Sequence, residues 1–291
     1  MKAKIILIFL YSFLFTALVF SQSDKGNKNN YGYNIVAGKF ADVNGIKMYY
    51  EIYGKGEPLV LIHGNSGSIA SMKFQIDFFS EHYKVIVADS RGHGKSLMGN
   101  QHFTYELLAE DWAELLNYLG LSSAYVLGWS DGGIIGLLLA SKYPEKIRKL
   151  AVMGANLRPD TSAVYPWAVE MVKREMKIAN EKLAEKDTTQ NWKLQKELLG
   201  LLGTQPHISL DCLNKITAPV LVLSGDKDVI REEHTVQIYQ NIPKAQLCIF
   251  PGETHLTPVT NPKLFNETVY KFFVEPFSRP DTRDYFESNG K

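Results

Sequence analysis

Short β-rich runs alternate with helical patterns along most of this 291-residue chain, and the alternation limits the folds open to it. Continuous apolar runs suit strands that are buried on both faces, as in a parallel sheet covered by helices. The runs are residues 46–52, 58–62, 85–88, 125–127, 150–153, 219–223 and 246–250. The pattern therefore predicts repeated β–α units in an open, mostly parallel, twisted sheet with helices on both faces.

Two helices can be placed from local signals. Apolar residues recur at helical spacing over residues 108–119, and Gly120 follows as a stop signal. Asn261 followed by Pro262 is a good helix start, and aromatic and aliphatic residues then line one face. We therefore expect one helix to end near Gly120 and another to open at Pro262.

The alternation stops once, over residues 157–210, which contain helical runs and no strand. We interpret this segment as a helical cap over the sheet. The sheet-bearing core then comprises residues 34–156 and 211–277, and the polar residues 278–291 are expected to form a loose tail.

The first residues read as a targeting signal. Lys2 and Lys4 precede an apolar run that ends at Phe20, and Ser21 is a small residue suited to cleavage. The run is short for a membrane span, so residues 1–21 are expected to be a signal peptide, with an uncleaved anchor as the alternative. The protein is then exported, periplasmic or secreted, without stable membrane insertion, and residues 22–33 form a flexible lead-in.

The net charge and the cysteine content exclude several classes of function. The formal net charge is +1, which lacks the basic excess of a nucleic-acid binder, so no nucleic-acid partner is expected. Two cysteines cannot build a disulfide framework or a cysteine-based zinc cluster. Cys212 and Cys248 are expected to be small buried side chains; a disulfide bridge, which export permits, and a reactive thiol are the alternatives.

One pentapeptide carries the strongest chemical signal. The G-x-S-x-G motif Gly128-Trp129-Ser130-Asp131-Gly132 directly follows a strand and opens an apolar helical run. A serine on such a tight strand-to-helix turn exposes its hydroxyl, and the helix N-terminus stabilises negative charge beside it. Ser130 is therefore the candidate nucleophile.

A serine hydroxyl needs a base, and that base needs an orienting carboxylate. Downstream of Ser130, Asp226 and Asp228 follow one strand and His255 follows the last strand. This is the chain order Ser, Asp, His, with all three groups at carboxyl ends of strands. We assign His255 as the base and Asp228 as the acid; Asp226 is the alternative acid, with a turn-stabilising role otherwise.

An oxyanion hole requires two backbone N–H groups. One is expected from Asp131, directly after the nucleophile, and the other from Asn65, with Ser66 as the alternative. His63, in the same loop, is expected to shape the loop rather than to react. No metal or cofactor is expected to take part.

These motifs, read as HGNSGS, DSRGHGKS, GWSDGG, GDKDVI and PGETH, resemble the α/β-hydrolase superfamily over residues 40–275. The segment around the Ser130 turn (the nucleophile elbow), residues 127–156, is similar to the biphenyl hydrolase-like (valacyclovir hydrolase) group, which cleaves α-amino acid esters. The resemblance implies that Asp131 contacts a substrate amino group; alternatively, Asp131 only fills a variable position. The cap aromatics Tyr165, Trp167 and Trp192 either line an acyl pocket or pack the cap onto the body. Trp129 is expected to pack beside the Ser130 turn, and Trp129 and Trp167 are the candidate substrate contacts.

The expected function is therefore that of an exported serine hydrolase acting on a small-molecule carboxylic ester. An amidase, an aminopeptidase, a lactonase or a C–C bond hydrolase could use the same residues. A ligand-binding protein without turnover on the same scaffold is the alternative from a different class.

Overall fold

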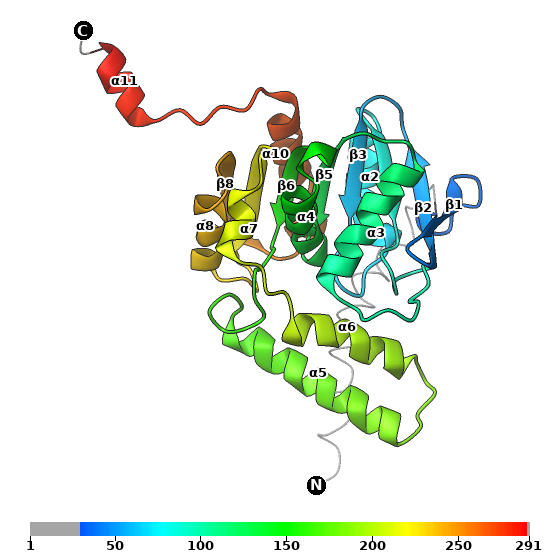
Figure 1. Ribbon diagram of the computed structural model, residues 1–291. Coiled ribbons are helices and arrows are strands. Elements are labelled where there is room, and N and C mark those ends of the chain that lie inside the picture. The colour runs from blue at the N-terminus through cyan, green and yellow to red at the C-terminus, as the bar shows by residue number, and fades with distance from the viewer. Residues whose placement is uncertain (1–29, 290–291) are drawn as a thin grey trace.

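The computed structural model describes residues 30–289, and an eight-stranded sheet forms its central layer (Figure 1). The strand order is β1-β2-β4-β3-β5-β6-β7-β8. The strands are β1 (Gly38–Val43), β2 (Ile46–Tyr53), β3 (Pro58–Ile62), β4 (Lys84–Ala88), β5 (Ala124–Trp129), β6 (Ile147–Met153), β7 (Val220–Lys227) and β8 (Ala245–Thr254). β1 pairs antiparallel with β2 and β2 with β4, whereas all later pairs are parallel, which confirms the predicted α/β class.

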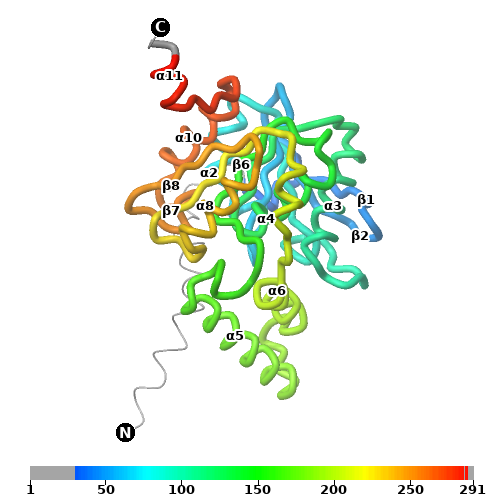
Figure 2. The backbone as a smooth tube through the Cα atoms, turned by 60° about the vertical axis from the view of Figure 1, so that its left-hand side comes forward, coloured from blue at the N-terminus to red at the C-terminus, as the bar shows by residue number. Residues whose placement is uncertain are grey.

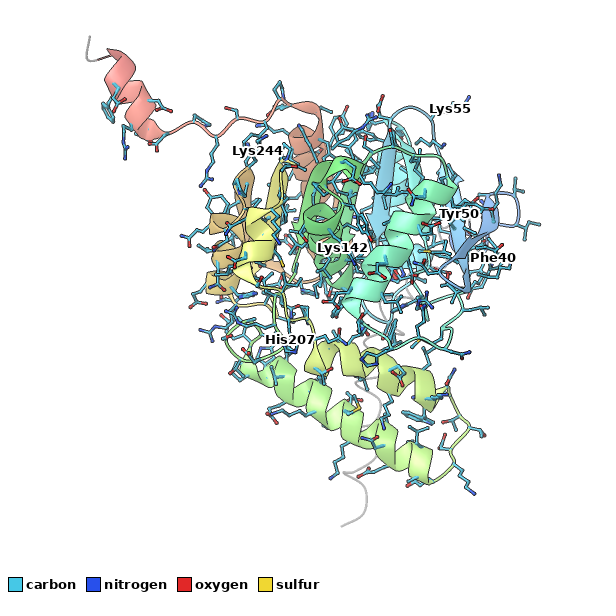
Figure 3. The ribbon with its side chains drawn as sticks, in the orientation of Figure 1. Phe40, Tyr50, Lys55, Lys142, His207 and Lys244 are labelled. Atoms are coloured by element: carbon cyan, nitrogen blue, oxygen red, sulfur yellow. The ribbon has the colours of Figure 1, made fainter. Side chains whose placement is uncertain are left out.

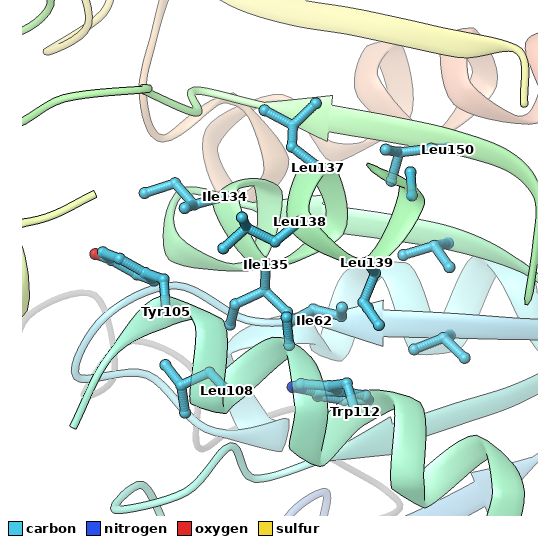
Figure 4. Close-up of a cluster of buried hydrophobic side chains, with 14 of the residues drawn as sticks. Ile62, Tyr105, Leu108, Trp112, Ile134, Ile135, Leu137, Leu138, Leu139 and Leu150 are labelled. Atoms are coloured by element: carbon cyan, nitrogen blue, oxygen red, sulfur yellow. The ribbon is translucent and has the colours of Figure 1, made fainter. Parts of the chain in front are cut away.

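Helices cover both faces of this sheet. The helical elements are η1 (Ile69–Met72), α2 (Lys73–Phe79), α3 (Tyr105–Tyr118), α4 (Asp131–Lys142), η2 (Pro144–Lys146), α5 (Pro166–Ala184), α6 (Trp192–Thr204), α7 (Leu210–Asn214), α8 (Glu232–Gln240), α9 (Thr257–Thr260), α10 (Pro262–Val274) and α11 (Thr282–Asn289). α3, α4, α7 and α8 contribute to one apolar core and η1, α2 and α10 to the other. Figure 4 shows part of the first core, where α3 and α4 pack beside the sheet.

The apolar runs of the sequence fill both cores because successive side chains of a strand point to opposite faces. On β3, Leu59 and Leu61 enter the core beneath α2, whereas Val60 and Ile62 enter the core beneath α3 and α4. A strand buried on both faces must be apolar at every position, so the unbroken runs in the sequence were the correct signal for this sheet.

The two predicted helices form where expected. α3 ends just before Gly120, whose positive φ of 67° suits glycine, and Thr104 caps its start by accepting the Leu107 N–H. α10 begins at Pro262 and buries its predicted apolar face. β1 was not anticipated, because the mixed sequence GKFADV lacks an apolar run. As an edge strand it alternates between exposed and buried residues over its second half.

Residues 157–210, predicted as the cap, hold α5 and α6 between β6 and β7. The two helices form a pair at one end of the sheet (Figures 1 and 2). An isolated antiparallel bridge between Val164 and Ile230 connects the start of this segment to the loop after β7. The cap therefore overlies the edge at which the parallel strands end.

Both ends of the described chain differ from expectation. α11 lies within the tail that was expected to be loose, and it stands away from the body of the molecule (Figure 1). Tyr31, expected in a flexible lead-in, is buried in the core, and its hydroxyl donates to Asp77 Oδ1 at 2.5 Å. The predicted signal peptide, residues 1–21, lies outside the described residues. Between residues 30 and 289, no helix has the length and apolarity that crossing a bilayer requires.

Candidate active site

Ser130 occupies a strained turn between β5 and α4. Its φ of 58° and ψ of −120° are unusual for a residue with a side chain, and its N–H donates to Met153 O at 2.7 Å. A Cβ on Gly128 would lie 2.1 Å from Gly132 O, and one on Gly132 would lie 2.1 Å from Ile62 O. The two glycines of the motif are therefore required for the backbone to make this turn.

His255 connects Ser130 to Asp228 by hydrogen bonds. His255 Nε2 lies 3.0 Å from Ser130 Oγ, and His255 Nδ1 lies 2.6 Å from Asp228 Oδ1. Asp228 follows β7 and His255 follows β8, so adjacent parallel strands deliver the two side chains to one edge. The arrangement can pass a proton from the serine hydroxyl to the imidazole.

The alternative acid, Asp226, has a different partner. Its Oδ2 accepts the Gly252 N–H at 2.9 Å, in the turn within β8. Asp228 Oδ1 instead accepts the Ile230 N–H as well as bonding His255. The geometry therefore favours Asp228 over Asp226 as the carboxylate that orients the imidazole.

Burial and neighbouring charges shift the pKa values of His255 and Asp228 in opposite directions. Burial alone lowers the pKa of His255, but the carboxylates of Asp228 and Asp131 together raise it above the ordinary value of 6.5. Burial likewise raises the pKa of Asp228, yet His255 and backbone N–H groups lower it overall. The pair therefore favours an ionised Asp228 beside an imidazole that readily accepts a proton.

Gly154, which the sequence reasoning missed, makes room for the imidazole. It follows β6 with a φ of 64°, and a Cβ there would lie 2.6 Å from His255 Nδ1. Trp129 holds the same residue from another side, because its Nε1–H donates to His255 O at 2.8 Å. A glycine directly after a predicted strand was the available signal for this close approach.

The loop after β3 lies against the elbow. A Cβ on Gly64 would lie 3.0 Å from Ser130 Cβ. Asn65 Nδ2 donates to Asp131 Oδ2 at 2.9 Å and to Leu198 O of α6 at 3.1 Å. His63 Nε2 accepts the Ser90 N–H, and burial lowers the pKa of His63 to about 4. A neutral, buried His63 fits the predicted loop-shaping role.

A cavity of about 610 Å³ opens beside Ser130 and His255. Cap residues supply an aliphatic wall that includes Val169, Met171 and Val172, and Trp129 also lines the cavity. The other aromatic candidates do not. Trp167 is 58% exposed, the Tyr165 hydroxyl donates to Glu232, and Trp192 Nε1 donates to Asp187. The acyl-pocket prediction is therefore wrong for these cap aromatics, since none of them lines the cavity.

Asp131 and Tyr105 give the cavity a polar inner end. Asp131 is 3% exposed and Tyr105 is fully buried, and both line the cavity together with Gln205. Burial raises the pKa of Asp131 to about 6, partly offset by the hydrogen bond from Asn65. Neither Tyr105 nor Gln205 was singled out from the sequence, because an isolated tyrosine or glutamine carries no motif.

The remaining reactive side chains lie elsewhere. Cys212 lies in α7 and Cys248 in β8, and both are free, so the possible bridge is not formed. His207 follows the cap helices in an exposed loop (Figure 3). Within the described residues, no three His, Cys, Asp or Glu side chains gather as a metal site would require.

Fold and site together define an α/β-hydrolase. The family model for the alpha/beta hydrolase fold matches residues 57–190. Serine hydrolase BPHL of Mus musculus is 28% identical over 257 residues, covering 83% of this chain and 88% of that protein.

Two further proteins illustrate the range of relatives. The (E)-2-((N-methylformamido)methylene)succinate hydrolase of Acinetobacter baylyi is 25% identical, covering 76% of this chain and 91% of its own length. The solved structure of a thermophilic esterase from Thermogutta terrifontis has a TM-score of 0.65 and 25% identity, covering 81% of this chain and 97% of that one. The relatives support a hydrolase, and the bond that it cleaves has to be inferred from the chemistry of the site.

Proposed function

We propose that this protein is an exported serine hydrolase that cleaves a small carboxylic ester through Ser130, His255 and Asp228. The continuous hydrogen-bonded connection from Ser130 Oγ through the imidazole to Asp228, beside a cavity of about 610 Å³, is the observation that carries the proposal. A serine, a base in reach of it and an acid that orients the base are the groups that nucleophilic acyl transfer needs.

In the first half-reaction, Ser130 Oγ attacks the ester carbonyl carbon while His255 Nε2 takes the hydroxyl proton. Asp228 Oδ1 accepts the Nδ1–H bond and stabilises the imidazolium that forms. Collapse of the tetrahedral intermediate breaks the carbon–oxygen bond, and His255 returns the proton to the departing alkoxide. The alcohol leaves and the acyl group stays on Ser130.

The negative charge of the intermediate requires donors. We assign the N–H of Asp131, the first residue of α4, and the N–H of Asn65 in the loop beside the elbow. An N–H in the first turn of a helix has no partner within that helix, and it points outward at its N-terminal end. Water, deprotonated by His255, then attacks the acyl-enzyme and releases the acid.

Asp131 supports a second, more specific candidate, the hydrolysis of α-amino acid esters. Its buried carboxylate follows the nucleophile directly and lines the same cavity. With a pKa of about 6, it is mostly ionised at neutral pH and can pair with a substrate ammonium group. An Asp131→Asn variant should then lose more kcat/KM on a valine p-nitrophenyl ester than on p-nitrophenyl butyrate.

Amide, lactone and C–C bond cleavage use the same nucleophile and base, so they remain alternatives for the bond that is cleaved. A ligand-binding protein is the alternative from a different class. It would bind ester without turnover, and the intact connection between Ser130, His255 and Asp228 argues against it.

The test is steady-state hydrolysis of p-nitrophenyl acetate, butyrate and octanoate by the wild type, Ser130→Ala and Ser141→Ala. Ser141 lies near the end of α4, where its hydroxyl donates to Leu138 O, so it serves as a matched control. We expect Ser130→Ala to lose roughly 10⁴-fold or more in kcat and Ser141→Ala to keep full activity. Ester turnover by pure Ser130→Ala at the wild-type rate would refute the proposal.

A further inference from the structure

The chain just before the sheet forms part of the cavity wall. Asn30, Tyr31 and Tyr33 line the same cavity as Ser130 and His255. These residues precede β1 and lie outside the region matched by the family model, which begins at residue 57. They therefore add to the site a wall that the hydrolase motifs do not encode.

A buried carboxylate fixes this segment in place. Glu51 on β2 is fully buried and accepts the Gly32 N–H at 2.9 Å and the Asn34 N–H at 3.0 Å. The hydroxyls of Tyr49 and Tyr53 donate to the same carboxylate at 2.8 Å and 2.7 Å. Hydrogen bonds to a buried charge are strong and directional, so the backbone of residues 32–34 is held on both sides of Tyr33.

The segment also packs against η1, which follows the loop that contains Asn65. A Cβ on Gly32 would lie 3.6 Å from Ala70 N and 3.7 Å from Ile69 Cβ, so the chain lies in contact range of η1. η1 follows the loop of Asn65, and that loop lies against Ser130 through Gly64. The wall is therefore continuous from Tyr33, through η1, to the candidate nucleophile.

Tyr33 presents a ring at the outer end of this wall. It is 62% exposed, and the Lys95 ammonium lies 4.5 Å from its ring centre, which restrains the ring. Phe74 of α2 also lines the cavity, and Met171 and Val172 of α5 line it from the cap. Apolar side chains from the body and the cap thus contribute to one cavity.

We infer that residues 31–33, clasped by Glu51, form a distal apolar subsite and that Tyr33 contacts the part of the substrate farthest from the scissile bond. The inference rests on the proposed hydrolase function for its kinetic readout. The ligand class is an ester with an aromatic or extended aliphatic group. Glu51 is a positioning residue, because it acts on the substrate only through this segment.

The experiment compares Tyr33→Ala, Tyr33→Phe and the matched control Ile35→Ala, using p-nitrophenyl octanoate. Ile35 is 94% exposed, lies two residues away and does not line the cavity. Loss of a ring contact should raise KM about five- to tenfold in Tyr33→Ala, with kcat within about twofold of wild type. Tyr33→Phe and Ile35→Ala should keep the wild-type KM. Glu51→Gln should raise KM in the same direction by loosening the segment.

Binding to an inactive background separates this inference from the proposed function. In Ser130→Ala the ester stays intact, and its Kd is measured by quenching of tryptophan fluorescence. Adding Tyr33→Ala should raise that Kd about five- to tenfold, even if the wild type fails to turn over esters. The subsite would be overturned if Tyr33→Ala left the KM of the active enzyme, and the Kd of the Ser130→Ala protein, within twofold of the values measured with Tyr33 present. The proposed hydrolysis would then still stand.

Discussion

The side-chain amide of Asn65 donates to Asp131 Oδ2 at 2.9 Å, so the two residues proposed as oxyanion donors are joined to each other. Asn65 belongs to the loop after β3, and Asp131 is the first residue of α4. The same amide also donates to Leu198 O of the cap helix α6 at 3.1 Å. One side chain therefore ties together the loop, the nucleophile turn and the cap.

Removing this tie should weaken turnover more than it weakens the fold. Removing a whole oxyanion donor costs roughly 10²- to 10³-fold in kcat. Asn65→Ala keeps the backbone N–H and loses only the side-chain bonds that position it, so we expect a smaller fall in kcat, roughly 10- to 100-fold. Steady-state kinetics with p-nitrophenyl butyrate and a thermal melt measure both effects. Wild-type kcat in a folded Asn65→Ala protein would contradict the claim that the side-chain amide of Asn65 positions the oxyanion donors.

Asp228 and Asp226 should behave differently although they are two residues apart. Asp228→Asn removes the charge that orients and stabilises the His255 imidazolium, so kcat should fall roughly 10³- to 10⁴-fold. Asp226→Asn alters only the contact to the Gly252 N–H, and its kcat should stay within about threefold of wild type. The reverse ranking would show that the acid had been assigned to the wrong residue.

The pH profile of kcat/KM should report the state of His255. The base must be neutral to accept the Ser130 proton, so activity should rise with pH through the pKa of His255, which lies above 6.5. The Asp131 carboxylate contributes to that elevation. Asp131→Asn should therefore move the rising limb to lower pH, and a shift to higher pH would contradict the assigned electrostatics.

Stability should depend strongly on the buried pair formed by Arg91 and Asp111. Each side chain is 1% exposed, and Arg91 Nε and Nη2 donate to the two Asp111 oxygens at 2.6 Å and 2.7 Å. Asp111→Ala leaves the guanidinium buried without its counter-charge, which should lower the free energy of unfolding by about 3–5 kcal/mol.

Urea unfolding measures this loss, with Glu181→Ala as the control. Glu181 forms an exposed pair with Lys177 on α5, and its removal should change the free energy of unfolding by less than about 1 kcal/mol. Equal effects of the two substitutions would contradict the claim that burial makes the Arg91–Asp111 pair important.

The sequence predicts the sheet and the Ser130 turn well because local rules determine them. Unbroken apolar runs are required where both strand faces are buried, and only glycine fits at Gly128 and Gly132. The order Ser130, Asp228, His255 then follows from parallel strands that end at one edge. The sequence alone therefore predicts that these three side chains, which are far apart along the chain, lie close together.

The cavity could not be predicted in the same way. Trp167 on α5 belongs to an amphipathic helix, and nothing in its sequence says which residues face the cavity and which face solvent. Tyr31 and Tyr33 lie in a polar, glycine- and asparagine-containing stretch whose backbone donates hydrogen bonds to Glu51 of β2, 17 to 19 residues further along the chain. Tertiary contacts, rather than local pattern, decide such positions.

The central claim, that Ser130 is an activated nucleophile, is tested most directly by labelling with a fluorophosphonate probe followed by peptide mapping. The probe phosphonylates a serine only where a base activates it and the resulting charge is stabilised. We predict one labelled site, Ser130, with labelling lost in Ser130→Ala, strongly slowed in Asp228→Asn and retained in Asp226→Asn. A wild-type protein that is folded yet unlabelled, or labelled at another serine, would contradict the account.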